Sequence, residues 1–582
     1  MRRSPVFAAL FAGLLLLQFA SAHSEVRVDL MVETPLGTVR GTTMTSRSGR
    51  TIYAFRGMRY GKPPVGELRF KPPVPVTESW DGIKNATEDG ASCPQASDFL
   101  SGPKSEDCLF LNVYSTKLPK RSSDLRNPVI LFIHHGGWFG LSGQSSLEGP
   151  QYLMDEDIVL VTINFRLGAL GFLSTGDSEV PGNNGLKDQL LAMKWVRDNI
   201  ASFGGNPDLV TIYGYSAGAA SVQYHMASPR SAGLFHRAIS SSGSALSGWA
   251  MTRDPMPLTR RLAKFMGYSN SESATSKQIV DFLRGKDAEA IAKSYFNLRE
   301  WNSDPLVIFA PVIEAEGSSD QPFLTEDPDS LFQTGNFAQV PWLTGSTNNE
   351  WMRRAKEIIN NATVLEDFSE NFEQIAPILF YYERGSPSSL RKSQKLKEFY
   401  FQNGQITKES LQPITDLYTD GHFLHGVDRS VKLISTSSRS PVYYYQFVYR
   451  GRFGHMPTEP GMERPPGAVH HDDLIYVFYP DGIFPFFAND FPEAVVSKRL
   501  VRMWANFART GNPTPISSNT DDLIETNWMP LTPTELSYME IGGDLTMKQA
   551  LRQERAAIWE DIYPTREATS HLSQTNRVRN KH

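Results

Sequence analysis

The stretch that decides the fold is LVTIYGYSAGAASV, residues 209–222. Its first five residues are apolar or β-branched and predict a buried strand, and the small residues at its end predict the first turn of a helix. Glycines two residues before and after Ser216 are typical of a sharp strand-to-helix turn that lifts a serine hydroxyl above the end of a sheet. Ser216 is therefore the candidate nucleophile, and the Ala217 amide is a candidate donor to an oxyanion. A simple structural turn is the alternative interpretation.

The surrounding sequence repeats this order of strand, turn and helix. Apolar runs at 129–133 and 158–164 predict buried strands, and the helical spacing of apolar residues in 185–203 predicts a crossover helix before the strand at 209–213. Such connections build a mostly parallel sheet with helices on both faces. Further strands are expected at 340–344 and 441–449, further helices at 501–508 and 547–562, and helical insertions at 269–303 and 353–419. We expect one α/β domain.

A second glycine-rich loop directly follows the strand at 129–133. It reads Ile133-His134-His135-Gly136-Gly137-Trp138. Glycines in this place allow backbone N–H groups to approach a carbonyl oxygen of the substrate, so the amides of Gly136 and Gly137 are candidate oxyanion donors together with that of Ala217. A turn that merely ends the strand is the alternative.

Composition and the N-terminus indicate a globular protein that leaves the cell. Of 582 residues, 40% are hydrophobic and 21% charged, and a net charge of −5 without a basic stripe disfavours nucleic acid as a partner. Residues 1–22 resemble a signal peptide, because two arginines precede an apolar run shorter than the ~20 residues of a membrane span and a small-residue cleavage site follows. We therefore expect secretion of one domain over 23–582, without a membrane span and with a polar tail from about 564.

The two cysteines of the chain, Cys93 and Cys108, predict one disulfide. Closing this short loop contributes about 3 kcal/mol in the chain-entropy description. Two cysteines without a nearby histidine supply too few ligands for zinc, so no metal site is expected. Asn85 and Asn361 begin N-x-S/T sequons and are candidate glycosylation sites.

Seven further short motifs occur in order along the chain: Phe55-Arg56-Gly57, Pro63-Pro64-Val65-Gly66, Ser105-Glu106-Asp107-Cys108-Leu109, Asn164-Phe165-Arg166-Leu167-Gly168, Gly182-Asn183-Asn184-Gly185-Leu186, Phe203-Gly204-Gly205-Asn206-Pro207 and Ser242-Gly243-Ser244. Through these motifs the chain resembles the type-B carboxylesterase and cholinesterase family over nearly the whole mature sequence. The resemblance implies the α/β-hydrolase fold.

The resemblance implies the remaining members of a catalytic triad. The segment 344–350 is similar to the one that ends in the family's acidic member, which implies Glu350, and 467–474 is similar to the family's histidine loop, which implies His470 as the base. His471 as the base, and Asp472 or Asp473 as its carboxylate partner, are the alternatives. An acyl-enzyme on Ser216 would then hydrolyse small carboxylic esters without a cofactor.

Other residues shared with the family are assigned to the scaffold. We expect two ion pairs, Arg69 with Glu106 and Arg166 with Asp188, rather than catalytic roles for these charges.

Two positions depart from the family near the expected site. His135 stands where many relatives have a third glycine, and would be strained if its φ were positive. Tyr215 stands where many have glutamate, which weakens the case for a cationic substrate. The loop 94–107 has Phe99 but no tryptophan for a quaternary ammonium, so cholinesterase activity is disfavoured. The small residues Pro305 and Val307, near a segment similar to the family's acyl pocket, favour acyl groups larger than acetyl.

Two other functions remain open. A catalytically weak or inactive cholinesterase-like adhesion protein keeps the fold and usually loses the triad, and a lipase differs by activation at an oil–water interface. The sequence selects no particular ester and leaves both monomer and homodimer open.

Overall fold

The computed structural model describes residues 30–564 except residues 98, 101, 122–123, 125, 403, 457–465 and 516–522. The expected signal peptide, 1–22, and the polar tail beyond Pro564 lie outside the described residues. The organisation of 23–582 as one domain stays a prediction.

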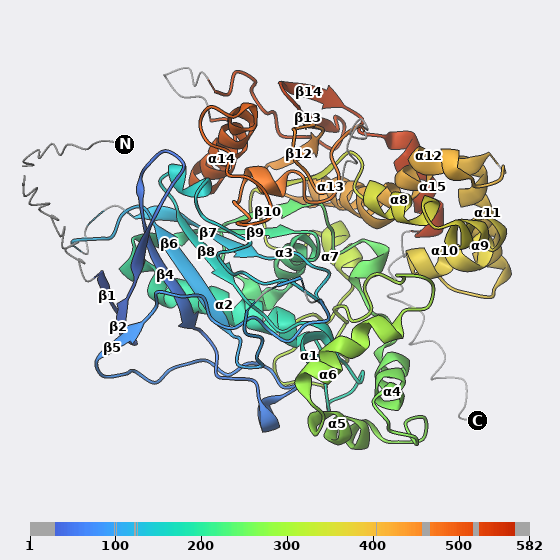
Figure 1. Cartoon of the computed structure of the whole chain (residues 1–582), viewed down its shortest axis with the longest axis horizontal. Coiled ribbons are helices and arrows are strands. Elements are labelled where there is room, and N and C mark those ends of the chain that lie inside the picture. The colour runs from blue at the N-terminus through green and yellow to red at the C-terminus, as the bar shows by residue number, and fades with distance from the viewer. Residues whose placement is uncertain are drawn as a thin grey trace, which may run out of the picture.

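Figure 1 shows a large twisted sheet with helices on both faces. The strands are β1 (Met31–Thr34), β2 (Gly37–Arg40), β3 (Thr42–Thr45), β4 (Thr51–Arg59), β5 (Ile83–Asn85), β6 (Phe110–Ser115), β7 (Asn127–Ile133), β8 (Val159–Ile163), β9 (Gly205–Tyr215), β10 (Arg237–Ser241), β11 (Trp342–Thr347), β12 (Val442–Phe447), β13 (Ser537–Ile541) and β14 (Leu545–Gln549). The α-helices are α1 (Gly168–Phe172), α2 (Asn184–Asn199), α3 (Ala217–Ala227), α4 (Pro255–Phe265), α5 (Ser276–Arg284), α6 (Ala288–Lys293), α7 (Pro328–Thr334), α8 (Met352–Ile359), α9 (Ala362–Glu370), α10 (Phe372–Phe380), α11 (Pro387–Phe401), α12 (Leu411–Thr419), α13 (His425–Ser437), α14 (Pro492–Thr510) and α15 (Gln553–Ile562).

In the described part of the chain, eleven strands form the main sheet in the order β14-β13-β12-β11-β10-β9-β7-β8-β6-β4-β3. The run from β8 through β7, β9, β10, β11 and β12 to β13 is parallel, and the strands outside it pair antiparallel. A separate small sheet has the order β1-β2-β5. The mostly parallel sheet predicted from sequence is confirmed, and the carboxyl ends of its strands share one edge, where ligands bind in such folds.

The two faces of the sheet bury separate hydrophobic cores. Successive side chains of a strand point to opposite faces, so Val129, Leu131 and Ile133 of β7 enter one core while Ile130 and Phe132 enter the other. Helices α2 and α3 cover the first face and α14 covers the second. Burial on both sides explains why the central strands are continuous apolar runs rather than alternating ones.

The predicted helical insertions are present. Helices α5 and α6 lie within 269–303, and α8 to α12 fall within or begin just before 353–419. The second group shares a third core with α15, which includes Phe368, Phe372 and Trp559 (Figure 1).

The prediction of a single helix over 547–562 is wrong in its first part. Residues Leu545–Gln549 form β14, which pairs antiparallel with β13, and the helix α15 begins only at Gln553. Met547 and Leu551 are spaced like residues on one helix face, but Leu545 and Met547 also alternate as in an edge strand. The strand formed because Leu545–Gln549 pairs with the edge of β13.

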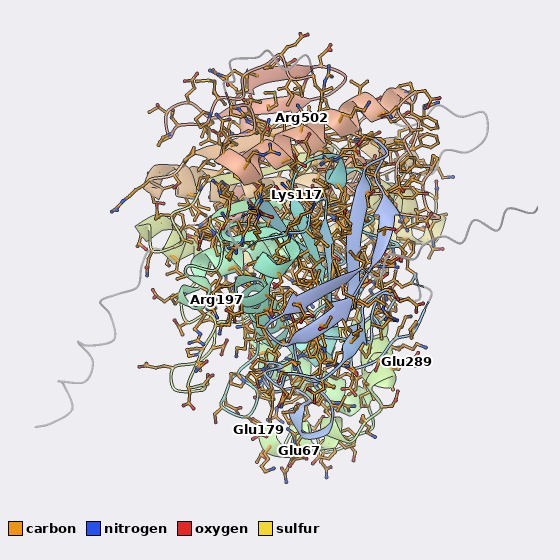
Figure 2. The ribbon with its side chains drawn as sticks, turned by 90° about the vertical axis from the view of Figure 1, so that its left-hand side faces the viewer. Glu67, Lys117, Glu179, Arg197, Glu289 and Arg502 are labelled. Carbon is orange, nitrogen blue, oxygen red and sulfur yellow. A yellow bond between two sulfur atoms is a disulfide. The ribbon has the colours of Figure 1, made fainter. Side chains whose placement is uncertain are left out.

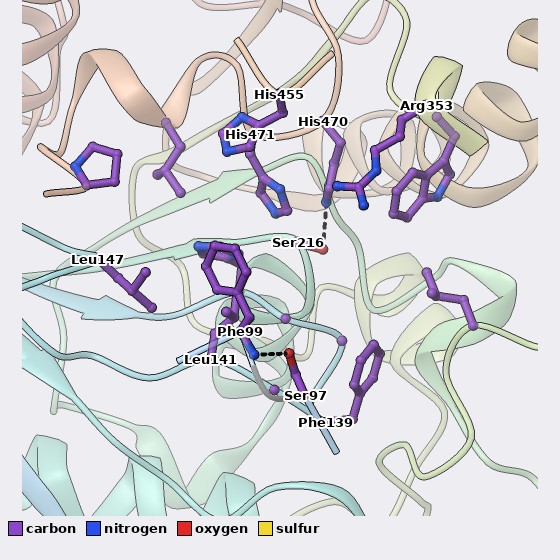
Figure 3. A pocket seen from close by; sticks show the side chains of 18 of the residues that line it. Ser97, Phe99, Phe139, Leu141, Leu147, Ser216, Arg353, His455, His470 and His471 are labelled. Atoms are coloured by element: carbon purple, nitrogen blue, oxygen red, sulfur yellow. Dashed lines mark hydrogen bonds between the residues drawn. The ribbon is translucent and has the colours of Figure 1, made fainter. Parts of the chain in front are cut away.

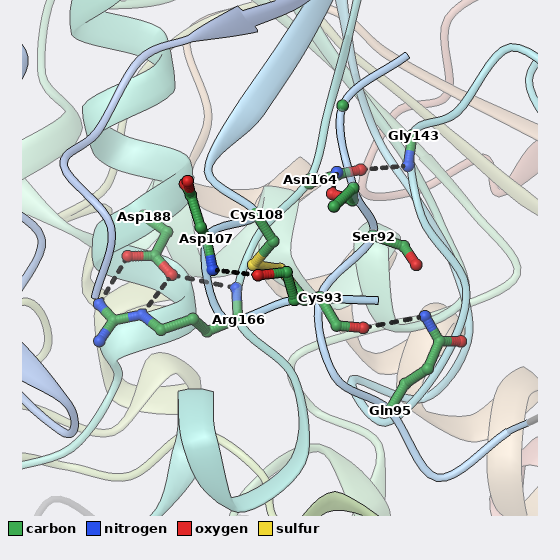
Figure 4. Close-up of a disulfide and its surroundings, with 12 residues drawn as sticks. Ser92, Cys93, Gln95, Asp107, Cys108, Gly143, Asn164, Arg166 and Asp188 are labelled. Atoms are coloured by element: carbon green, nitrogen blue, oxygen red, sulfur yellow. Dashed lines mark hydrogen bonds and ion pairs between the residues drawn. A yellow bond between two sulfur atoms is a disulfide. The ribbon is translucent and has the colours of Figure 1, made fainter. Parts of the chain in front are cut away.

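The scaffold interactions expected from the sequence are present. Cys93 and Cys108 form a disulfide, and Figure 4 shows the Arg166–Asp188 pair close to it. Arg166 binds both carboxylate oxygens of Asp188 at 2.6 and 2.8 Å, and Arg69 binds Glu106 in the same two-pronged way at 2.5 and 2.7 Å. Both predicted ion pairs are thus confirmed.

Many charged side chains lie on the outside of the molecule, and several of these are labelled in Figure 2. Within the described ranges, no helix has both the length and the hydropathy of a membrane span.

Candidate functional site

Ser216 stands at the tight turn between β9 and α3. Its backbone has φ 55° and ψ −119°, a strained conformation for a residue other than glycine. A Cβ on Gly218 would collide with the carbonyl of Ile133, so glycine is required where the turn passes the neighbouring strand. The local sequence therefore folds as the strand–turn–helix that it predicts, with the hydroxyl at the carboxyl end of the sheet.

A line of hydrogen-bonding groups runs from Ser216 through His470 to Glu350. His470 Nε2 lies 3.0 Å from Ser216 Oγ, and His470 Nδ1 lies 2.5 Å from Glu350 Oε2 (Figure 3 draws the first of these). The other carboxylate oxygen of Glu350 accepts the Thr347 amide at 2.8 Å, and the His470 amide donates to the Glu350 carbonyl at 2.9 Å. All three side chains are buried. The structure thus brings together the three residues that resemblance had implied.

The alternative residues of the histidine loop have other partners. His471 donates its backbone N–H to Tyr215 Oη at 2.9 Å, and its Nε2 has no hydrogen-bond partner among the described residues. Asp472 accepts the amides of His455 and Val469 at 2.6 and 2.9 Å and so closes its own loop. This geometry favours His470 over His471 as the base.

Asp473, the remaining alternative, lies in a buried network with two tyrosines. Tyr215 Oη donates to Asp473 Oδ1 at 2.6 Å, and Tyr445 Oη donates to Asp473 Oδ2 at 3.0 Å. Burial, with a smaller contribution from the charge of Glu350, raises the pKa of the Asp473 carboxyl to about 7. Tyr215 thereby connects the turn at Ser216 to the histidine loop through a hydrogen bond. The sequence showed only that Tyr215 stands where many relatives have glutamate, and it did not indicate this connection.

The glycine loop after β7 faces the same space. Gly136 has φ 101°, and a Cβ there would collide with the carbonyl of Gly140. The backbone amides of Gly136, Gly137 and Ala217 donate to no acceptor among the residues that the structure describes. They are therefore available to a substrate oxygen.

His135 does not carry the strain that a positive φ would have caused. The positive φ angles of this loop fall on Gly136, Gly137 and Trp138 instead. The His135 ring lies 4.2 Å from that of His471, centroid to centroid, and His135 Nε2 is 3.4 Å from Glu148 Oε1. Burial, followed by the charges of His470 and His455, lowers the pKa of His135 to about 3, so the ring is neutral at physiological pH.

A pocket of about 310 Å³ opens above Ser216, and its walls are mostly apolar (Figure 3). Trp351 and Phe423 pack against the His470 ring at centroid distances of 5.2 and 4.6 Å. Trp351 follows Glu350 in the chain, whereas Phe423 comes from a buried π-helical turn, Asp420–Leu424, between α12 and α13. No sequence pattern pointed to Phe423, because only tertiary packing brings that turn to the pocket.

Expectations about the pocket wall are met in part. Val307 lines the pocket together with Leu306, and Phe99 reaches it with 61% of its surface exposed. Pro305 is not among the lining residues. Among the described residues that line the pocket, Arg353 carries a permanent positive charge.

The candidate glycosylation sites are both exposed. Asn85 ends β5, and Asn361 is the N-cap of α9, with its side-chain oxygen accepting the Val364 amide at 3.3 Å. Across the described part of the chain, no group of three or more histidine, cysteine or acidic side chains is arranged to hold a metal ion.

The parallel sheet covered on both faces, with the strand–turn–helix at its carboxyl edge, defines an α/β hydrolase. The sequence profile of the Carboxylesterase family matches residues 28–559, so the chain belongs to that family. It is 39% identical over 551 residues to juvenile hormone esterase of Tribolium castaneum, covering 91% of this chain and 92% of that protein. It is 38% identical over 538 residues to esterase FE4 of Myzus persicae, covering 88% and 91% of the two chains. The crystal structure of juvenile hormone esterase from Manduca sexta, with OTFP covalently attached, superposes with a TM-score of 0.79 at 28% identity and covers 92% of this chain and 99% of that one.

Proposed function

We propose that the protein is a secreted serine carboxylesterase that hydrolyses carboxylic esters through an acyl-enzyme on Ser216. The observation that carries the proposal is the hydrogen-bonded line from Ser216 Oγ to His470 Nε2 at 3.0 Å and from His470 Nδ1 to Glu350 at 2.5 Å. Membership of the Carboxylesterase family supports the reaction class.

In the first half-reaction, His470 removes the proton of Ser216 while the serine oxygen attacks the ester carbonyl. Glu350 holds the imidazole tautomer with its N–H toward the carboxylate and stabilises the imidazolium that forms. The tetrahedral intermediate collapses when His470 gives its proton to the leaving alcohol. Water then attacks the acyl-enzyme by the same proton transfers and releases the carboxylic acid.

The amides of Gly136, Gly137 and Ala217 would stabilise the oxyanion in both half-reactions. Each is without an acceptor among the described residues. Gly136 and Gly137 line the same pocket as Ser216, and Ala217 follows Ser216 in the chain. Loss of one such donor typically costs roughly 3–4 kcal/mol of transition-state stabilisation.

The lining of the pocket favours an uncharged, apolar ester. Trp249, Trp351 and Phe423 offer apolar contact, whereas Arg353 disfavours a cationic group such as choline. Hydrolysis of juvenile hormone is named for two of the similar proteins. That ester class is therefore the first to compare with simple alkyl esters and acetylcholine.

Secretion is part of the proposal. The Cys93–Cys108 disulfide is typical of an oxidising compartment, and the sequons at Asn85 and Asn361 are exposed to a glycosyltransferase. A product of insect-cell expression found in the medium, with a mass that falls on deglycosylation, would support this; retention inside the cell would contradict it.

The central test is hydrolysis of 4-nitrophenyl butyrate by the wild type and by Ser216→Ala, with and without an organophosphate. We expect the variant and the inhibited enzyme to be inactive, and mass spectrometry to find one phosphoryl adduct on the peptide that contains Ser216. A folded wild type without activity would favour the inactive adhesion protein instead.

Two histidine variants separate the candidate bases. His470→Ala is expected to abolish the organophosphate adduct, whereas His471→Asn, which tolerates the positive φ at that position, is expected to form it. The reverse pattern would identify His471 as the base.

A further inference from the structure

A second large groove lies away from the pocket above Ser216, and the two share no lining residue. Its volume is about 810 Å³, within the ~300–1,000 Å³ typical of ligand sites. It is bounded by α2, by the proline-rich segment 72–77, by the turn between β1 and β2, and by residues 319–323. The proposed esterase mechanism uses none of these segments.

One face of α2 forms part of the groove. Lys187, Leu190, Leu191, Lys194 and Trp195 recur at spacings of three and four residues, which places them along one side of a helix. Leu190 and Leu191 supply an apolar strip between the two lysines, and Trp195 continues it beyond Lys194. Prolines 72, 73 and 75 extend this apolar surface with a backbone whose φ angles are fixed.

Some cations of the groove form ion pairs with carboxylates and others do not. Lys187 forms a buried ion pair with Glu314 at 2.9 Å, and Arg197 binds its neighbour Asp198 at 2.7 Å. Lys194, in contrast, forms no ion pair with any residue that the structure describes.

Arg230 is the second cation of the groove without an ion-pair partner among the described residues. Its guanidinium donates to the neutral side chain of Gln321 at 2.5 Å. Asp320, which also lines the groove, is exposed to solvent. Burial, followed by the positive charges of Arg230 and Arg197, lowers the pKa of the Lys194 ammonium, and the nearby Asp198 carboxylate offsets only part of this effect. An anion bound here would relieve that repulsion.

We propose that this groove binds an amphipathic carboxylate, such as a free medium-chain fatty acid, with the carboxylate between Lys194 and Arg230 and the alkyl chain along Leu190, Leu191 and the prolines. The groove combines an apolar strip with two cations that form no ion pair among the described residues, and this pattern is complementary to an apolar chain with one negative end. A carboxylate matches the fork of an arginine and the ammonium of a lysine together. The site is separate from Ser216, so the proposal does not depend on the esterase mechanism.

Calorimetric titration of the full-length protein with dodecanoate, below its micelle concentration, tests the site. Titrations are run before and after treatment with an organophosphate, so that any binding in the pocket above Ser216 is recognised as the part lost on treatment. We expect one binding event that survives treatment and weakens at least about tenfold in Lys194→Glu and in Arg230→Glu, because each loses a charge-assisted contact and gains a repulsive one.

The control variant is Lys117→Glu, which makes the same change in net charge at an exposed lysine outside the groove. It should bind dodecanoate like the wild type, and all three variants should hydrolyse 4-nitrophenyl butyrate at the wild-type rate. Equal affinity in the wild type and both groove variants would overturn the proposal, as would equal binding of dodecanol, which lacks the charge.

Two other occupants give different results. If the groove contacts a second copy of the chain, the groove variants change the oligomeric state in light scattering and leave dodecanoate affinity unchanged. If it contacts a membrane, the wild type binds vesicles containing anionic phospholipid but not free dodecanoate. Either result would refute the fatty-acid site, and neither would bear on the reaction at Ser216.

Discussion

Replacing Asp473 with asparagine is expected to remove one component of the pH dependence of folding stability. Asp473 is buried and accepts hydrogen bonds from Tyr215 and Tyr445 at 2.6 and 3.0 Å. Asparagine has nearly the same shape and can still accept one of these bonds and donate the other, since a tyrosine hydroxyl can also accept. The substitution therefore removes the ionisation with little change in packing.

The size of the effect follows from the raised pKa. Burial raises the pKa of Asp473 from 3.8 to about 7, so between these values the folded protein holds a proton that the unfolded chain has released. The free energy of unfolding contributed by this group is therefore highest below pH ~4, falls as the pH rises toward ~7, and is constant above that. Between about pH 5 and about pH 8 the loss amounts to roughly 3 kcal/mol, at 1.36 kcal/mol per pH unit.

Urea unfolding of both proteins at about pH 5 and about pH 8 measures this difference. Other buried groups also titrate, but they are present in both proteins. The pH dependence of the difference in free energy of unfolding between the wild type and Asp473→Asn therefore reports Asp473 alone. As the pH rises over this interval, we expect the free energy of unfolding of Asp473→Asn to increase by roughly 3 kcal/mol relative to that of the wild type. The control variant Asp490→Asn, which changes an exposed carboxylate, should show no such relative increase. Parallel stability curves for the wild type and Asp473→Asn would refute the reasoning.

Three further substitutions test the site and its scaffold. Glu350→Gln should lower kcat by about 10³- to 10⁴-fold in a 4-nitrophenyl butyrate assay, because the amide no longer fixes the tautomer of His470; a loss below tenfold would argue for another carboxylate. Gly136→Ala should lower kcat/KM by about 10²-fold or more, because its φ of 101° and the nearby Gly140 carbonyl leave no place for a methyl group, with circular dichroism as the check on folding. Arg166→Met should destabilise the protein by about 3–5 kcal/mol in urea, because it leaves a buried carboxylate unpaired, and Asp188→Leu added to it should restore most of that stability; equal stability of the single variant and the wild type would contradict the structural role.

The sequence specified the parts of the fold that depend on local pattern. The buried strands at 129–133 and 209–213 were predictable because burial on both faces of a sheet requires continuous apolar residues. The position of Ser216 was predictable because only glycine fits the crowded turn around it. The boundary at 547–562 was not, since strand and helix spacings coincide there and the choice depended on the free edge of β13.

Some residues of the candidate site were likewise predictable from the sequence, and others were not. The sequence by itself determined Ser216 and the glycine loop, and resemblance to a family added Glu350 and His470, which lie 120 and 254 residues from their partners in the hydrogen-bonded line. Only the tertiary structure decided that Tyr215 binds Asp473, that Phe423 packs against His470 and that Lys194 and Arg230 line one groove. These contacts join segments distant in the chain, and no local periodicity encodes them, because they arise only when helices and loops pack against the finished sheet.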